Sequence, residues 1–229
     1  MSQSIASQQD PHRGEPIETR GEQVDQAAGV VVMVHGRGGS AQDILPLSSE
    51  IGAPGLAYVA PQAAGHTWYP YSFLMPVEQN EPFLSSALAS VGRVLAKVSD
   101  AGIPPERTVL LGFSQGACLV SEFVARNPRR YGGLIVLSGG LIGPDGTPRD
   151  YQGSLDGTPV FIGCSDTDAH IPASRVRETG TVMEQLGGEV DLRIYPGTGH
   201  TINRDELDAA RAIVKSVASA SSQSGQSAK

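Results

Sequence analysis

Short apolar runs alternate with longer stretches of helical periodicity along most of this chain. We predict strands at residues 30–35, 56–61, 107–113, 132–139, 158–163 and 189–197. We predict helices at residues 41–52, 83–98, 115–127, 172–187 and 204–219. Strands that are apolar along their whole length are typical of a parallel sheet buried on both faces. The alternation therefore predicts an α/β fold, a three-layer sandwich in which helices cover both faces of a mostly parallel sheet.

The alternation continues without an internal repeat, which favours one domain. The sequence has 229 residues, a length that fits one domain or two. We expect a single domain at residues 15–219. Residues 1–14 and 220–229 are polar and rich in serine and glutamine. Such segments bury too little apolar surface to fold, so we expect a flexible N-terminal segment and a disordered tail.

Composition argues against several classes of partner. The net charge of −7 disfavours nucleic acid, because phosphate binding needs a basic face. The first 26 residues lack an apolar signal segment, and no apolar run approaches transmembrane length. We therefore expect a cytoplasmic protein without integral membrane association. The sequence carries no signal for an oligomeric state.

The cysteines and histidines show no metal-ligand spacing. We therefore predict no metal site, and no other cofactor is indicated. Cys118 and Cys164 each lie among apolar residues, where cysteines are usually buried free thiols. The sequence favours free thiols and leaves a disulfide open as the alternative.

One serine stands between two glycines where a predicted strand gives way to a predicted helix. The stretch is Gly112-Phe113-Ser114-Gln115-Gly116. A Gly-x-Ser-x-Gly pattern alone is short enough to arise by chance, but this position is the one that a nucleophile elbow requires. The elbow is a sharp turn whose neighbours must lack bulk, and glycines meet that need. We therefore predict that Ser114 is a nucleophile.

A serine nucleophile needs a base, and the base needs an acid that orients it. In this type of fold the expected chain order is serine, then acid, then histidine. Asp166 and Asp168 follow the predicted strand at 158–163, and His200 follows the strand at 189–197. The order is the expected one, and each candidate follows its own strand. We predict His200 as the base and one of the two aspartates as the acid.

Acyl transfer also needs an oxyanion hole, usually made of two backbone N–H groups. One is expected from Gln115, the residue after the nucleophile. The other is expected from Arg37 in the glycine-rich loop after the first predicted strand, with its side chain pointing elsewhere. The same loop, "GRGGSA", also fits a dinucleotide-binding fingerprint. That alternative requires an acid near the end of the next strand, which instead ends in "VAPQ".

Four motifs together resemble the phospholipase/carboxylesterase family of α/β-hydrolases, which includes acyl-protein thioesterases. They are "HGRGG", "GFSQGA", "SDTDAHIP" and "GTGH". The resemblance implies the α/β-hydrolase fold and a triad of Ser114, Asp168 and His200, with Arg37 and Gln115 at the oxyanion positions. Asp168 matches the family pattern because it stands four residues before Pro172.

The sequence departs from the family pattern near the expected substrate rim. Many relatives have "HGLGD" where this chain has "HGRGG", and many have an aspartate after the tryptophan of the segment at 66–76. That segment, "HTWYPYSFLMP", is interrupted by prolines and reads as a loop. It is either ordinary packing or a wall over an acyl pocket. The pocket hypothesis assigns substrate-binding roles to Trp68, Phe73, Leu74, Met75, Leu141 and Ile142.

These observations lead to one expected function and two alternatives. We expect a serine carboxylesterase that hydrolyses short-chain esters of small molecules through an acyl-enzyme intermediate. A lysophospholipase or acyl-protein thioesterase would use the same residues on a longer chain. A nicotinamide-dinucleotide-binding protein is the second alternative. The sequence does not identify the physiological substrate.

Overall fold

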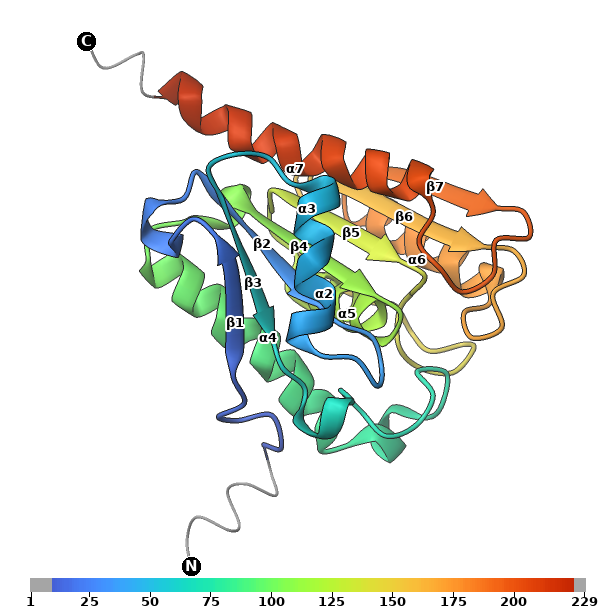
Figure 1. Cartoon of the computed structure of the whole chain (residues 1–229). Coiled ribbons are helices and arrows are strands. Elements are labelled where there is room, and N and C mark those ends of the chain that lie inside the picture. The colour runs from blue at the N-terminus through green and yellow to red at the C-terminus, as the bar shows by residue number, and fades with distance from the viewer. Residues whose placement is uncertain (1–9, 225–229) are drawn as a thin grey trace, which may run out of the picture.

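A seven-stranded sheet forms the centre of the computed structural model, which describes residues 10–224 (Figure 1). The strands are β1 (Ile17–Gly21), β2 (Gly29–Val34), β3 (Leu56–Pro61), β4 (Thr108–Phe113), β5 (Gly133–Leu137), β6 (Pro159–Ser165) and β7 (Glu189–Tyr195). Their order in the sheet is β1-β3-β2-β4-β5-β6-β7. Only β1 runs antiparallel to its neighbour, so the sheet is mostly parallel, as predicted.

Helices cover both faces of the sheet (Figure 1). One face carries α4 (Phe83–Asp100), α5 (Gln115–Arg126) and α6 (Ala173–Gln185). The other face carries α2 (Ala41–Ile44), α3 (Ser48–Ile51) and α7 (Arg204–Ser224). Short 3₁₀ helices lie at Val24–Gln26, Leu45–Leu47, Ala64–His66, Val77–Asn80 and Pro105–Arg107. The three layers of the predicted sandwich are therefore present.

The apolar runs have two buried faces because the side chains of a strand alternate. Along β2, Val30, Val32 and Val34 belong to the core beneath α4 and α5. Val31 and Met33 belong to the separate core beneath α7. All five are at most 1% exposed, so a strand without polar alternation is what this position requires.

Two local features differ from the sequence prediction. The predicted helix at 41–52 is divided into α2, a 3₁₀ turn at Leu45–Leu47 and α3. Pro46 lies inside this turn and has no N–H to continue an α-helix. Strand β1 was not predicted, because it is a short, half-exposed edge strand of mixed composition.

The structured part of the chain is longer than predicted at both ends. Residues 10–14 were expected to be flexible, but Asp10 pairs with Arg93 at 2.9 Å and His12 is buried. The His12 ring also contacts the carbonyl oxygen of Trp68 at 2.8 Å. At the other end, α7 continues to Ser224, beyond the predicted limit at 219. Residues 1–9 and 225–229 of the predicted flexible ends lie outside the described residues.

Candidate active site

Ser114 occupies a strained turn between β4 and α5. Its φ and ψ are 55° and −119°, a conformation that costs free energy for a residue with a side chain. A Cβ on Gly112 would lie 2.4 Å from the Gly116 carbonyl oxygen, and one on Gly116 would lie 2.1 Å from that of Val34. Both glycines are therefore required by close backbone packing, which gives the Gly-x-Ser-x-Gly pattern a structural cause.

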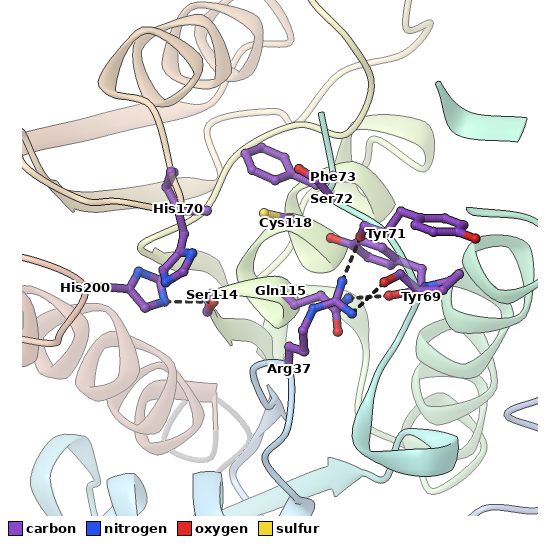
Figure 2. A pocket seen from close by; sticks show the side chains of 12 residues that line it. Arg37, Tyr69, Tyr71, Ser72, Phe73, Ser114, Gln115, Cys118, His170 and His200 are labelled. Carbon is purple, nitrogen blue, oxygen red and sulfur yellow. Dashed lines mark hydrogen bonds between the residues drawn. The ribbon is translucent and has the colours of Figure 1, made fainter. Parts of the chain in front are cut away.

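Ser114, His200 and Asp168 lie in one hydrogen-bonded line, although they come from loops after three different strands. His200 Nε2 lies 2.9 Å from Ser114 Oγ, and His200 Nδ1 lies 2.7 Å from Asp168 Oδ2. An ionised carboxylate only accepts hydrogen bonds, so Nδ1–H donates to Asp168 and the neutral ring keeps Nε2 free to accept. Figure 2 shows the bond between His200 and Ser114. This arrangement can remove the hydroxyl proton of Ser114.

The loop after β6 orients Asp168 rather than Asp166 toward His200. Asp168 Oδ1 accepts hydrogen bonds from the N–H groups of His170 and Ile171 at 2.8 and 3.0 Å. Burial alone would raise the pKa of Asp168, but its hydrogen bonds from the His200 ring and these two N–H groups hold the pKa below its usual value. Asp166 instead accepts from the N–H of Gly197 at 2.8 Å.

Two backbone N–H groups beside Ser114 are candidates for an oxyanion hole. Those of Arg37 and Gln115 have no hydrogen-bond partner among the residues that the structure describes. The loop that presents Arg37 is fixed by His35, whose ring bonds the Gly36 carbonyl oxygen at 2.8 Å and accepts from the Ala63 N–H at 3.1 Å. Burial lowers the pKa of His35, which favours the neutral ring that this pair of contacts needs.

The side chains of the same two residues hold the segment that covers the site. Arg37 donates to the carbonyl oxygens of Pro70 and Tyr71 at 2.9 and 2.7 Å (Figure 2). Gln115 donates to the Tyr69 carbonyl oxygen at 2.8 Å and accepts from the Trp68 N–H at 2.9 Å. The Arg37 side chain therefore crosses to this segment while its backbone N–H stays beside Ser114.

A cavity of about 510 Å³ opens beside Ser114 (Figure 2). Its lining consists of Arg37, Tyr69, Pro70, Tyr71, Ser72, Phe73, Ser114, Gln115, Cys118, His170, Ile171 and His200. Of the six residues predicted to bind substrate, Phe73 alone belongs to this lining. His170 is exposed, and its ring meets the His200 ring edge-on at 4.9 Å.

The other five predicted substrate residues lie outside the lining for identifiable reasons. Trp68, Leu141 and Ile142 are 0% exposed and belong to the core, and Trp68 Nε1 donates to the His35 carbonyl oxygen. Leu74 packs on the edge of that core, and Met75 is 38% exposed. Sequence patterns place apolar residues in a loop but do not distinguish those facing the core from those facing a cavity.

Residue spacing in the sequence indicates one further lining residue, Cys118. Cys118 lies four residues after Ser114, and this spacing places it one helical turn further along the same face of α5. The other lining residues of this loop are Tyr69, Tyr71 and Ser72. Only the tertiary structure shows which side chains of the loop line the cavity.

Both cysteines are free and buried, which confirms the favoured prediction. Burial raises the pKa of each thiol to about 12, and the charge of Asp168 adds to this effect at Cys164. The described part of the chain contains no group of three or more histidine, cysteine or acidic residues that could hold a metal ion. Among helices of residues 10–224, none is long and apolar enough to cross a membrane.

The loop after β2 does not provide the site that a dinucleotide would need. Such a ligand places its pyrophosphate at the N-terminus of the following helix. Here the first N–H of α2, on Ala41, donates to the side chain of Gln62 at 2.9 Å. Helix α2 has only four residues. The nicotinamide alternative therefore has no support in this loop.

Glu206 is a buried acid close behind the site. It forms a capping box at the start of α7, in which its Oε2 accepts from the Asn203 N–H at 2.8 Å and its N–H donates to Asn203 Oδ1 at 3.0 Å. Oε1 is buried without a hydrogen-bond partner among the described residues. Burial raises the pKa of Glu206 from 4.5 to about 7.

Glu206→Gln is expected to change how stability depends on pH. The folded protein binds more protons at Glu206 than the unfolded chain between pH 4.5 and 7, so its contribution to the unfolding free energy falls as pH rises through this range. Glutamine keeps an acceptor for Asn203 without the charge. Urea unfolding at about pH 5 and about pH 8 should show that the variant gains stability relative to the parent at the higher pH. A difference that is the same at both values would contradict this assignment.

A family model described as Phospholipase/Carboxylesterase matches residues 21–218. The chain belongs to this family. A crystal structure of a phospholipase/carboxylesterase from Dyadobacter fermentans is 45% identical with a TM-score of 0.84, covering 89% of this chain and 96% of that one. The crystal structure of Arabidopsis thaliana SOBER1 shares the fold, with a TM-score of 0.69. It is 20% identical and covers 82% of this chain and 98% of that one. The predicted α/β-hydrolase fold and family are confirmed.

Curated relatives of the family carry two kinds of name. Acyl-protein thioesterase 1 of Gibberella zeae is 33% identical over 51% of this chain and 50% of its own length. A probable carboxylesterase, SOBER1-like, of Arabidopsis thaliana is 27% identical over 64% of this chain and 56% of its own length. The chain thus spans little more than half the length of these relatives.

Proposed function

We propose that this protein is a cofactor-independent serine hydrolase that cleaves short carboxylic esters of small molecules. The observation that carries the proposal is the line of hydrogen bonds from Ser114 through His200 to Asp168, next to two N–H groups that are candidates for an oxyanion hole. The names of the curated relatives support ester or thioester hydrolysis. A cytoplasmic location stays a prediction.

The geometry suggests the order of the chemical steps. Ser114 Oγ attacks the ester carbonyl carbon while His200 Nε2 takes its proton, and the N–H groups of Arg37 and Gln115 stabilise the negative oxygen. The protonated His200 then gives the proton to the departing alcohol, which leaves an acyl group on Ser114. Water, deprotonated by His200, attacks this acyl group, and His200 returns the proton to Ser114 Oγ as the carboxylic acid leaves. Asp168 keeps the imidazole oriented and stabilises its charged form.

A fluorophosphonate probe tests the proposed reaction class most directly. Such probes react with a serine that a neighbouring base has activated, so we expect stoichiometric labelling at Ser114. Peptide mapping of the labelled protein identifies the modified residue. Absence of labelling, together with no hydrolysis of p-nitrophenyl acetate, would overturn the proposed function.

We expect this cavity to take short acyl chains rather than the long chains of lipids or acylated proteins. Each methylene group that the cavity buries contributes about 0.8 kcal/mol to binding. The preferred acyl-chain length therefore reports how long the apolar part of the cavity is. We expect kcat/KM on p-nitrophenyl esters to peak at roughly two to six carbons. Phe73 lines the cavity and is 6% exposed, so Phe73→Ala should move the peak to longer chains. Met75→Ala is the control, because Met75 lies outside the lining.

A thioesterase or lysophospholipase remains the second candidate, supported by the names of the thioesterase relatives. The same series of esters, extended from acetate to palmitate, separates the two. A maximum of kcat/KM at dodecanoate or a longer chain would contradict the preference for short acyl chains and favour acyl-protein or lipid substrates.

A further inference from the structure

The cavity beside Ser114 has an unusual charge balance for a protein with a net charge of −7. Its lining contains one fully charged group, the guanidinium of Arg37, together with two imidazoles and no carboxylate. In the part of the chain that the structure describes, Arg37 forms no ion pair. Asp43 shares a smaller neighbouring hollow with Arg37, and its carboxylate accepts from Ser40 Oγ at 2.7 Å. A positive charge without an ion-pair partner therefore borders the proposed reaction site.

The guanidinium of Arg37 keeps part of its hydrogen-bonding capacity free. It has five N–H groups. Nη1 donates to Thr67 Oγ1 and the Pro70 carbonyl oxygen, and Nη2 donates to the Tyr71 carbonyl oxygen. All three acceptors are neutral, so they leave the charge uncompensated. The Nε–H and one Nη2–H have no partner among the described residues, and these groups can donate to a carboxylate.

We propose that the preferred substrates are short esters that carry a carboxylate in addition to the ester group, and that Arg37 recognises this carboxylate. The inference rests on the proposed function and names its substrate class. The backbone N–H of Arg37 is one of the two groups proposed to bind the oxyanion. Arg37 therefore lies next to the reacting carbonyl, and its side chain starts from this position. The free charge thus lies within reach of a second group on a short substrate.

The glycine-rich loop supports this assignment. The loop reads "HGRGG", so Arg37 stands between glycines and no acidic residue lies beside it in the loop. The cavity lining also includes Ser72, whose hydroxyl group can donate a hydrogen bond. The unpaired charge of Arg37 is therefore complementary to an anionic group on a substrate, while Phe73 and Ile171 keep part of the wall apolar.

The test compares matched esters that differ in charge. Monomethyl and dimethyl succinate carry the charged or masked carboxylate on the acyl side, and carboxymethyl acetate and its methyl ester carry it on the alcohol side. We expect kcat/KM to favour the charged member of one pair by roughly two- to fivefold, the upper part of the range for an exposed ion pair. Raising NaCl from about 0.05 M to about 0.5 M should reduce this ratio, because salt screens exposed charges.

Variants locate the effect at Arg37. Arg37→Met should bring the ratio to about one, and Arg37→Lys should keep part of it because the charge remains. Arg129→Met is the matched control, since Arg129 lies beyond the opposite end of α5 from Ser114 and should leave the ratio unchanged. Salt dependence is measured on the unsubstituted protein, so it stays informative even if Arg37→Met disturbs the covering segment.

The outcomes separate this inference from the proposed function. Hydrolysis of both neutral esters at rates equal to or above those of their charged partners, insensitive to salt, would overturn the role of Arg37 and leave the hydrolase in place. If Arg129→Met lowered the ratio of kcat/KM between charged and neutral esters as much as Arg37→Met, the effect would come from the overall charge of the protein, and the role of Arg37 would also be overturned. Failure to hydrolyse any ester or to react with the fluorophosphonate would remove the proposed function and this inference together.

Discussion

Ser114→Ala is expected to abolish ester hydrolysis and fluorophosphonate labelling while the fold persists. The hydroxyl is the only group at this position that His200 can activate, because it lies 2.9 Å from Nε2 at the apex of the turn. Residues of such a triad act as a unit, and loss of the serine costs about 10⁶ in kcat in a well-studied protease. Alanine fits the same turn, since it is smaller than serine. The measurement is kcat on p-nitrophenyl acetate, with labelling followed in parallel.

Ser121→Ala is the matched control for this variant. Ser121 lies on α5, is buried, and donates to the Ala117 carbonyl oxygen at 2.8 Å rather than to His200. It should keep both hydrolysis and labelling. Retained labelling in Ser114→Ala would show that the nucleophile lies elsewhere. A large fall in thermal stability of that variant would instead attribute the loss of activity to the fold.

The order of elements and the alignment of Ser114, Asp168 and His200 were predictable from the sequence because strand ends are local features. Each of the three follows an apolar run, and parallel strands bring their carboxyl ends to one edge of the sheet. The choice of Asp168 over Asp166 came from the family pattern alone. The structure adds a physical reason, the two N–H groups that hold Asp168 Oδ1.

The cavity wall was not predictable in the same way. Trp68 and Phe73 lie in one short loop and both pack in the core, yet only Phe73 of the two also lines the cavity. The difference arises from contacts between segments far apart in the sequence, including those that Arg37 and Gln115 make with residues 67–71. His12 adds a contact from the N-terminal segment, which sequence composition had marked as flexible.

Asp168→Asn is expected to reduce kcat by roughly 10⁴, the scale of a wrong imidazole tautomer in a serine protease. The structure explains which way the new amide would turn. The N–H groups of His170 and Ile171 both donate to Oδ1, so the amide oxygen must take that position. Its NH₂ group then replaces Oδ2, 2.7 Å from His200 Nδ1. A donor there favours the tautomer with the proton on Nε2, which cannot accept the proton of Ser114.

Asp166→Asn provides the control because the same exchange meets a different environment. Asp166 Oδ1 accepts from the Gly197 N–H at 2.8 Å, and an asparagine oxygen can accept that bond equally well. Among the described residues Asp166 forms no hydrogen bond with His200, so we expect kcat to stay within about threefold of the parent, as for ordinary surface substitutions. Greater damage from Asp166→Asn than from Asp168→Asn would reverse the assignment of the acid. Equal and small effects of both would mean that His200 is oriented by its loop rather than by a carboxylate.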